Sequence, residues 1–199
     1  MRFSTRELLD FGVAWVALSA AFTIFFDRPA FLAFDLPLLG HLLALSLLTV
    51  GVGFLLHEMA HKVTAIRFGQ IAEFRADYGM LFIAVVSAMA GFIFAAPGAV
   101  YHRGRSTVRE NGLIALAGPV TNLGLAVVFL PLLLFGGFLG QVGYLGVIVN
   151  LFLAGFNMLP VGPLDGKTVL HWHKGVFVVV FVPAVALGLF AMFGLSLPI

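Results

Sequence analysis

The sequence contains no cysteine and very few charged side chains. Of its 199 residues, 10% are Asp, Glu, Lys or Arg, whereas 61% are hydrophobic. The absence of cysteine excludes disulfide bridges and thiolate metal ligands. The fraction of charged residues is also far below that of a typical soluble domain. The net charge of +2 is too small to indicate a nucleic-acid partner. The composition therefore predicts a protein embedded in a lipid bilayer.

The hydrophobic residues gather in six blocks that are candidates for crossing the roughly 30 Å of bilayer hydrocarbon. These blocks are residues 11–26, 38–56, 80–96, 113–138, 142–159 and 176–197. The polar segments between them are short, and none resembles a linker between two domains. We therefore predict a single integral membrane domain over residues 1–199. Its expected fold class is all-α and polytopic, with five or six transmembrane helices.

The distribution of basic residues tests whether all six blocks span the membrane, because cytoplasmic loops are enriched in Lys and Arg. If all six blocks cross, the eleven basic residues divide five against six. If the block 80–96 instead enters and leaves on one side, every basic residue except Arg28 falls on the same side. This bias favours five crossings and a re-entrant segment at 80–96. It also predicts a multi-pass protein whose N-terminus faces the cytoplasm.

A re-entrant segment must satisfy its backbone polar groups against protein, because lipid offers no hydrogen-bond partners. The polar stretches on either side of the block, 71–75 and 99–102, have the character of short strands. We expect these stretches to pair into a small membrane-associated β element beside the functional site. The alternative is that 80–96 is an ordinary transmembrane helix.

A His57-Glu58-Met59-Ala60-His61 motif follows the block 38–56 without a break. In a helix, residues four apart differ by about 40° around the axis, so His57 and His61 project from one face and can share a metal ion. Glu58 lies one position further round, where its carboxylate can act as general base toward a water molecule at that ion. Ionisable groups in membrane segments are costly and usually functional. A purely structural alternative is that Lys62 neutralises Glu58.

A catalytic zinc takes three protein ligands, so a third ligand is required. The extended His-x-x-Gly-x-x-His form is excluded because Thr64 and Arg67 occupy its Gly and second His positions. Asp165 is the best candidate, since it directly follows an apolar block in the Pro- and Gly-rich segment 157–166. An Asp-Gly turn with no metal is the other interpretation of these residues. A different metalloprotease, with Glu110 as third ligand, also stays open.

Three segments together resemble the site-2 protease family of intramembrane zinc metalloproteases. They are the His57–His61 motif, Ala117-Gly118-Pro119-Val120-Thr121-Asn122, and the Phe156-Asn157-x-x-Pro160-x-x-Pro163-Leu164-Asp165-Gly166 segment, in the order found in that family. The resemblance covers about residues 38–170, which we expect to be the catalytic core. It implies one zinc ion per chain, held by His57, His61 and Asp165, with Glu58 as base.

The resemblance also implies a second catalytic residue and a class of substrate. Asn157 matches an asparagine that holds the substrate backbone or the developing oxyanion, the alternative being an amide that only bonds the broken helix end. Asn122 is expected to brace helix packing. The expected substrates are transmembrane or membrane-anchored proteins in the cell membrane of a prokaryote, cleaved in or near their membrane segments. The active site is expected on the cytoplasmic side. The non-enzymatic alternative is a small ion or zinc transporter, or an inactive relative.

Overall fold

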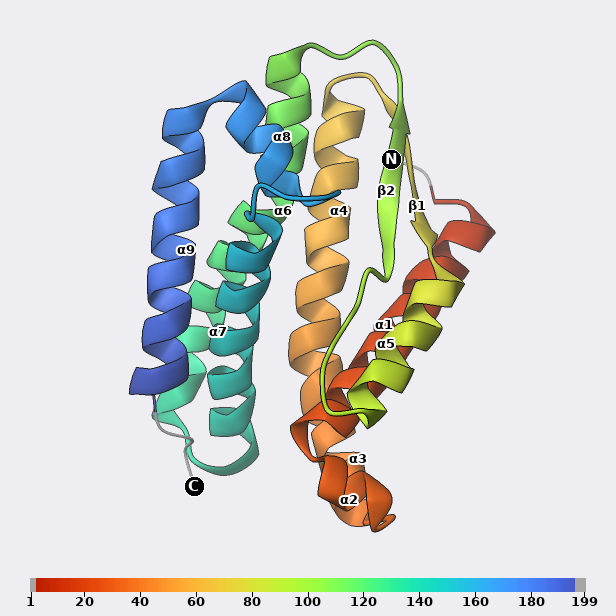
Figure 1. The fold of residues 1–199 in the computed structure, drawn as a ribbon, viewed down its shortest axis with the longest axis vertical. Helices are drawn as coiled ribbons and strands as arrows, with labels where there is room; N and C mark the ends of the chain where they lie inside the picture. The colour runs from red at the N-terminus through yellow and green to blue at the C-terminus, as the bar shows by residue number, and fades with distance from the viewer. Residues whose placement is uncertain (1–2, 196–199) are drawn as a thin grey trace.

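The computed structural model describes residues 3–195, which form helices and one small sheet (Figure 1). Five apolar helical segments are long enough to cross a membrane: Thr5–Phe26, Leu36–Arg67, Val108–Leu134, Gly137–Asn157 and Lys174–Gly194. The block 80–96 contains only a twelve-residue helix, Tyr78–Met89 (α5), which is too short to be among them. The predicted all-α polytopic membrane fold is therefore confirmed, with five candidate spans. Arg2 and residues 196–197 of the last predicted block lie outside the described residues.

The helices begin where side chains can cap their first turn. Ser4 accepts a hydrogen bond from the Glu7 amide and starts α1 (Thr5–Phe26). Thr107 and Glu110 form a reciprocal capping box at the start of α6 (Val108–Phe129). Both helices thus begin several residues before the apolar blocks that predicted them, because a helix starts at its cap rather than at its first lipid-facing residue.

The longest span passes through α3 (Leu36–Ser46), a π-helical turn at Leu47–Gly51 (η1) and α4 (Val52–Arg67). At about 1.5 Å per residue, its 32 residues reach about 48 Å, so it extends beyond the hydrocarbon or tilts within it. The indole of Trp15 in α1 donates to the Leu47 carbonyl at 3.0 Å. This contact satisfies a backbone group in the π-helical turn and fixes α1 against the span that carries the His57 motif.

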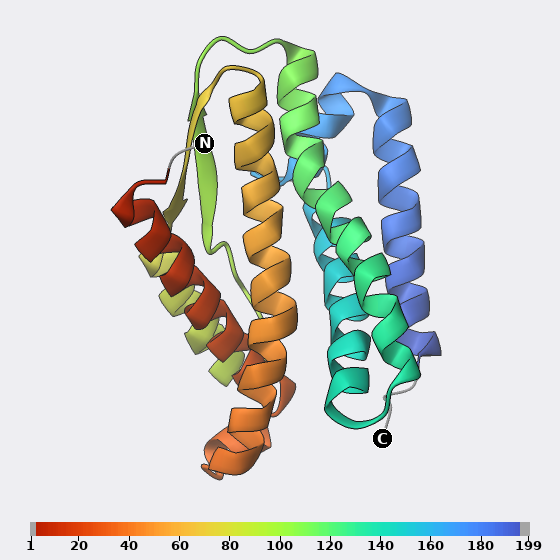
Figure 2. The ribbon, with the colours of Figure 1, turned by 180° about the vertical axis from the view of Figure 1, so that it is seen from behind.

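The helices form two groups that meet along α4 and α6. Figures 1 and 2 show α1 and α5 beside α4, whereas α7 (Gly137–Asn157) and α9 (Lys174–Gly194) lie beyond α6. A 3-10 turn at Leu130–Leu134 (η2) joins α6 to α7. The short helices α2 (Arg28–Leu32) and α8 (Asp165–Trp172) lie at opposite ends of the molecule. The helix that carries the His57 motif, α4, therefore lies at the junction of the two groups.

Two antiparallel strands flank α5, as the sequence predicted. Strand β1 (Ile71–Ala76) pairs with β2 (Gly98–Arg103), and Phe74 lies opposite Val100. The chain leaves the end of α4, descends through α5, and returns through 90–97 to the same end of the molecule (Figure 1). The returning stretch is bonded to α5, since Ser87 Oγ accepts from the Phe94 amide at 3.0 Å. This path has the geometry of a re-entrant segment, and entry into the bilayer stays a prediction.

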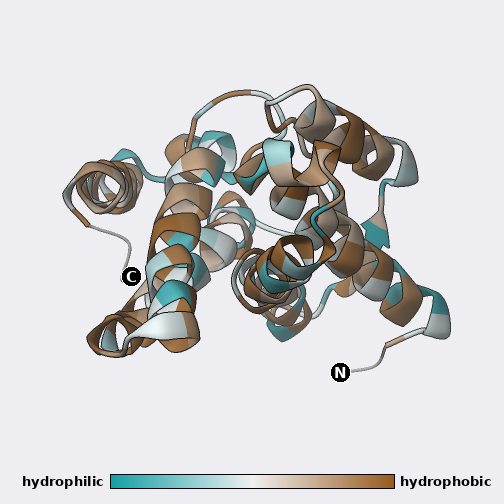
Figure 3. Cartoon of the chain, turned by 90° about the horizontal axis from the view of Figure 1, so that it is seen from below, coloured by the Kyte–Doolittle hydropathy of each residue, from teal (hydrophilic) through white to brown (hydrophobic). Residues whose placement is uncertain are grey.

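The outer faces of the helices are hydrophobic, as expected for contact with lipid. Figure 3 shows brown, hydrophobic residues around most of the helical surface. Exposed side chains such as Val128, Leu134 and Phe193 are 67%, 88% and 82% accessible. Polar side chains are instead buried between helices, among them Asn122 and Asn150 at 0% exposure. This inside-out distribution agrees with a protein whose solvent is largely the bilayer.

Candidate metal centre

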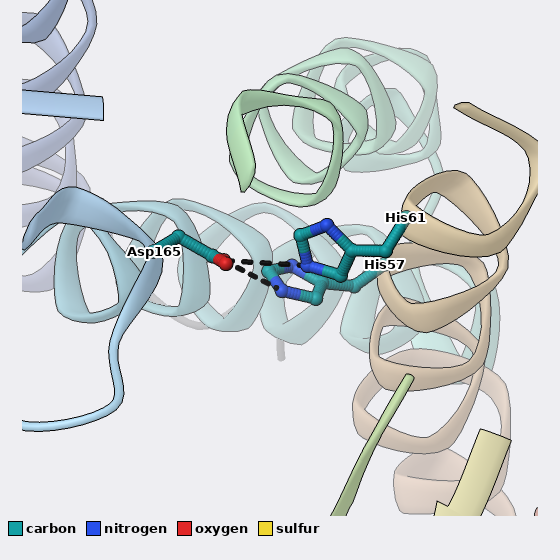
Figure 4. A group of neighbouring side chains, drawn as sticks. All are labelled: His57, His61 and Asp165. Carbon is teal, nitrogen blue, oxygen red and sulfur yellow. Dashed lines mark ion pairs between the residues drawn. The ribbon is translucent and has the colours of Figure 1, made fainter. Parts of the chain in front are cut away.

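The structure brings His57, His61 and Asp165 together at the junction of the two helix groups (Figure 4). The two imidazole Nε2 atoms lie 3.2 and 3.3 Å from the same carboxylate oxygen of Asp165. One candidate ligand atom from each residue falls within 4.8 Å of the others. Two nitrogens and one carboxylate oxygen form the donor set of a catalytic zinc site.

Asp165 reaches this position because the chain breaks sharply after α7. Pro160 and Pro163 lack the amide hydrogen that a continuing helix needs, and α8 restarts at Asp165 itself. A Cβ on Gly166 would lie 2.0 Å from the Met158 carbonyl oxygen, so a side chain there would collide with the end of α7. The glycine therefore allows α8 to begin directly against α7, with the Asp165 carboxylate turned toward α4.

The second ring nitrogen of each histidine is held by an oxygen. His57 Nδ1 lies 2.6 Å from Asn122 Oδ1, and His61 Nδ1 lies 2.7 Å from the Ile114 carbonyl oxygen. A carbonyl oxygen accepts only, so each neutral ring carries its proton on Nδ1 and turns the Nε2 lone pair toward Asp165. With both rings in this tautomer, two nitrogen lone pairs and a carboxylate oxygen converge on one point, and a cation placed there would satisfy all three. The site therefore fits a divalent metal ion.

The charge of the Asp165 carboxyl also suits a metal ligand. Burial alone would raise its pKa, but the interactions of the carboxylate with His61 and His57 outweigh burial and hold the pKa at about 2. The carboxylate is therefore ionised at neutral pH.

Glycine in α6 creates the space for the imidazole rings. A Cβ on Gly118 would lie 2.5 Å from ring atoms of both His57 and His61. The Gly118–Asn122 part of the second motif thus has two roles beside the site, since Gly118 makes room for the rings and Asn122 bonds one of them. From the sequence, Asn122 was expected to brace helix packing, and its contact with His57 was not predicted. A polar, uncharged residue within an otherwise apolar helix is the sequence signal that could have indicated this contact.

Glu58 lies beside the three candidate ligands and faces strand β2. Glu58 is 8% exposed, and its carboxyl lies close to the backbone N–H of Val100. The backbone N–H of Phe74 donates to Glu7 Oε1 at 2.9 Å and therefore points away from β2. In an antiparallel ladder the opposed residue then also turns its N–H outward, so the Val100 N–H points away from β1. The outer edge of β1 is thus covered by α1, whereas the outer edge of β2 faces Glu58. A base and an open strand edge lie side by side.

Two curated relatives match this chain over most of its length. A Methanocaldococcus jannaschii protein named "Putative zinc metalloprotease MJ0611" is 41% identical over 197 residues, which cover 96% of this chain and 97% of the relative. A Bacillus subtilis protein named "Putative zinc metalloprotease YwhC" is 32% identical over 162 residues, covering 71% of this chain and 72% of the relative. The chain belongs to this zinc metalloprotease family. No protein-family profile and no solved structure match it.

The other candidate ligand of the metalloprotease lies away from the metal centre. Glu110 is partly exposed, and its carboxylate caps α6 by accepting from the Thr107 amide at 2.7 Å. Its predicted alternative role as third ligand is therefore not supported by the geometry.

Lys62 does not neutralise Glu58 in the metalloprotease. Its ammonium group instead lies 2.5 Å from Glu7 of α1, and both side chains are 1% exposed. The alternative in which Lys62 pairs with Glu58 is therefore not supported, because the described ion pair of Lys62 is with Glu7. The ion pair ties α1 to the helix turn that follows His61.

Asn157 stands at the last residue of α7, one loop away from Asp165. Its side-chain amide donates to the Leu153 carbonyl at 2.9 Å, which is a bond within its own helix. The predicted role of Asn157 as a donor to substrate stays a prediction. Three of the four remaining histidines have other partners: His41 contacts Gln141, His102 contacts Gln70, and His173 caps α9.

Proposed function

We propose that this metalloprotease is an intramembrane protease of the site-2 type. It would hydrolyse peptide bonds in or near the transmembrane segments of membrane-anchored proteins, in regulated intramembrane proteolysis. The observation that carries the proposal is the position of the donor set: His57 and His61 belong to the Leu36–Arg67 span itself, and Asp165 closes the site from α8. A substrate must therefore come to a site built from membrane helices.

One zinc ion per chain is the proposed cofactor, with His57, His61 and Asp165 as ligands. When bound there, zinc would polarise the scissile carbonyl and acidify the attacking water. Glu58 would take the proton of that water and pass it to the leaving amine nitrogen. The burial of Glu58 among helices keeps bulk water away from this transfer.

The edge of β2 supports a way to present the substrate. A transmembrane helix hides its scissile bonds within its own hydrogen bonds, so the substrate must become extended before cleavage. An extended segment can add to a free strand edge through backbone hydrogen bonds. The sequence suggested 71–75 for this role, but the β1 edge is bonded to Glu7, and Val100 of β2 is the residue beside Glu58.

Asn157 is the proposed second catalytic residue. Its side chain is partly exposed at the start of the loop that leads to Asp165. Its bond to Leu153 uses one hydrogen of the amide group, and an amide has two. The other hydrogen can serve the carbonyl oxygen of a substrate as it becomes negative.

The basic residues support an orientation with the N-terminus and the site on the cytoplasmic side. The start of α1, the end of α4, the start of α6 and α8 all lie at one end of the molecule (Figure 1). Of the ten basic residues in the described part of the chain, Arg28 belongs to α2 at the other end. The other nine belong to these segments, to the strands and loop between α4 and α6, or to the start of α9. The proposed location is the cell membrane of a prokaryote.

The test compares wild-type protein with Glu58→Gln in liposomes that contain a fluorescent transmembrane substrate. The proposal expects cleavage by the wild type and at least a hundredfold slower cleavage by Glu58→Gln with equal zinc content, since general-base catalysis contributes about 10²–10⁴-fold. Equal cleavage rates would overturn it. Zinc-dependent ion flux from the same liposomes, without proteolysis, would instead favour the transporter.

A further inference from the structure

Two asparagines are buried completely between membrane-spanning helices. Asn122 of α6 and Asn150 of α7 are both 0% exposed. An amide group inside an apolar bundle is costly unless each of its polar atoms has a partner. Each polar atom of these two amide groups is therefore expected to have a hydrogen-bond partner.

The bonds form a chain whose direction is fixed. Asn150 Nδ2 donates to the Gly146 carbonyl at 2.8 Å, so Asn150 Oδ1 faces the other way. Asn122 Nδ2 donates to that Oδ1 at 2.8 Å and to the Gly53 carbonyl at 3.1 Å. Because backbone carbonyls only accept, neither amide can be turned over without losing its bonds. Asn122 Oδ1 is thereby left to face His57.

We propose that Asn150 is a positioning residue for the metal centre, acting through Asn122 on His57. The chain from the Gly146 carbonyl through both amides ends at His57 Nδ1, 2.6 Å from Asn122 Oδ1. It keeps the proton of the neutral ring on Nδ1 and presents the Nε2 lone pair to the metal. Partners of this kind orient a ligand and raise metal affinity.

Asn150 is needed because Asn122 alone is held less firmly. Without the oxygen of Asn150, Asn122 keeps one fixed partner, the Gly53 carbonyl. A turned-over Asn122 amide would offer a donor to His57 Nδ1, and the ring would then carry its proton on Nε2, where it opposes metal binding. Gly53 supports the same arrangement, because a Cβ there would lie 2.8 Å from Asn150 Oδ1.

The inference rests on the proposed zinc site and not on proteolysis, so zinc affinity is its first measurement. Purified variants are titrated with zinc against a competing chelator. Asn122→Leu should bind zinc about 10–100-fold more weakly, which is the usual effect of losing such a partner, and Asn150→Leu about tenfold more weakly. Asn150→Asp, as the neutral carboxylic acid in this apolar bundle, can donate to the Gly146 carbonyl and keep its other oxygen toward Asn122, so it should stay within about threefold of wild type.

Two further variants separate positioning from packing. Asn150→Ser can still bond the Gly146 carbonyl within its helix but is too short to reach Asn122, so it should fold and lose affinity like Asn150→Leu. Thr121→Val removes a hydroxyl that bonds only the Ala117 carbonyl in the described contacts, and it should leave zinc affinity unchanged. In Asn122→Leu, the added Asn150→Leu change should weaken affinity no further.

Nitrogen-15 NMR of the zinc-saturated protein gives a readout that a loss of packing would not produce. The His57 Nδ1 proton should exchange with water faster in Asn150→Leu and Asn150→Ser. The His61 Nδ1 proton, which bonds the Ile114 carbonyl, is the internal control and should not change. Wild-type zinc affinity in both Asn150→Leu and Asn150→Ser, additive losses in the double variant, or equal acceleration at the two histidines would each overturn the inference.

Discussion

The backbone of Gly118 lies so close to His57 that a Cβ would be 2.5 Å from the Cε1 and Nε2 atoms of the ring. The same Cβ would lie 2.5 Å from His61 Nε2. Helix α6 thus packs directly against the two imidazole rings of the metal centre. We predict that Gly118→Ala displaces both rings and weakens zinc binding by about tenfold or more, as measured by competition with a chelator.

Gly124 provides the matched control on the same helix. A Cβ there would meet nothing within 4 Å. Gly124→Ala should therefore keep the zinc affinity of the wild type and could add up to about 1 kcal/mol of helix stability. Equal zinc affinities in Gly118→Ala and Gly124→Ala would show that the close approach of α6 does not matter for the metal.

A second prediction concerns the identity of the third ligand. Asp165→Ala removes the only carboxylate that the described contacts place between the two imidazoles. The purified variant should contain no stoichiometric zinc by elemental analysis, and saturating zinc should no longer raise its melting temperature. For the wild type, zinc at a hundred times its Kd should add about 2.7 kcal/mol to the free energy of unfolding.

Glu110→Ala is the comparison for Asp165→Ala. Loss of the bond from the Thr107 amide to the Glu110 carboxylate should cost about 1 kcal/mol at the start of α6, and zinc content should stay that of the wild type. Zinc loss in Glu110→Ala with retention in Asp165→Ala would reverse the assignment of the ligand.

The sequence predicted the parts of the site that depend on local geometry. The spacing of His57 and His61 places them on one helix face whatever surrounds the helix, and the long apolar blocks predict spans because hydrocarbon thickness sets their length. The strands at 71–75 and 99–102 were also predicted. These features depend only on the residue periodicity of helices and strands and on the thickness of the bilayer.

The contacts that complete the site could not be predicted in this way, because they join residues far apart in the chain. Lys62 could reach a carboxylate on its own helix, Glu58, or one on another helix, and only the packing of α1 against α4 shows that the partner is Glu7. Asn122 likewise meets His57 only because α6 packs against α4 at Gly118. Helix α8 was missed because its residues are mostly polar.

A third prediction concerns the ion pair of Glu7 and Lys62, which are both 1% exposed. Glu7→Gln removes the carboxylate that faces the buried ammonium group and weakens the bond to the Phe74 amide. Breaking a buried pair from one side typically costs about 3–5 kcal/mol, so we expect a clear fall in melting temperature in detergent. Because Lys62 follows His61, zinc affinity should fall as well.

Glu73→Gln is the matched control, because Glu73 also pairs with a basic residue but at the surface. Its carboxylate lies 2.8 Å from Arg75, and both side chains are about a third exposed. Exposed pairs contribute about 0–1 kcal/mol, so the melting temperature should barely change. Equal destabilisation by the two variants would contradict a special role of the buried pair.

The last prediction tests the edge of β2 as the place where substrate is held. The Val100 amide points away from β1 toward Glu58, so Val100→Pro removes this donor without removing a hydrogen bond between the strands. We expect zinc content and melting temperature close to wild type, but cleavage of a transmembrane substrate slower by about tenfold, equivalent to about 1.4 kcal/mol. Val100→Ala loses a similar side-chain contact and keeps the amide, so it should cleave at nearly the wild-type rate. If Val100→Pro cleaves as fast as Val100→Ala, the substrate does not depend on this edge. If the two variants are equally slow, the Val100 side chain matters and the amide does not.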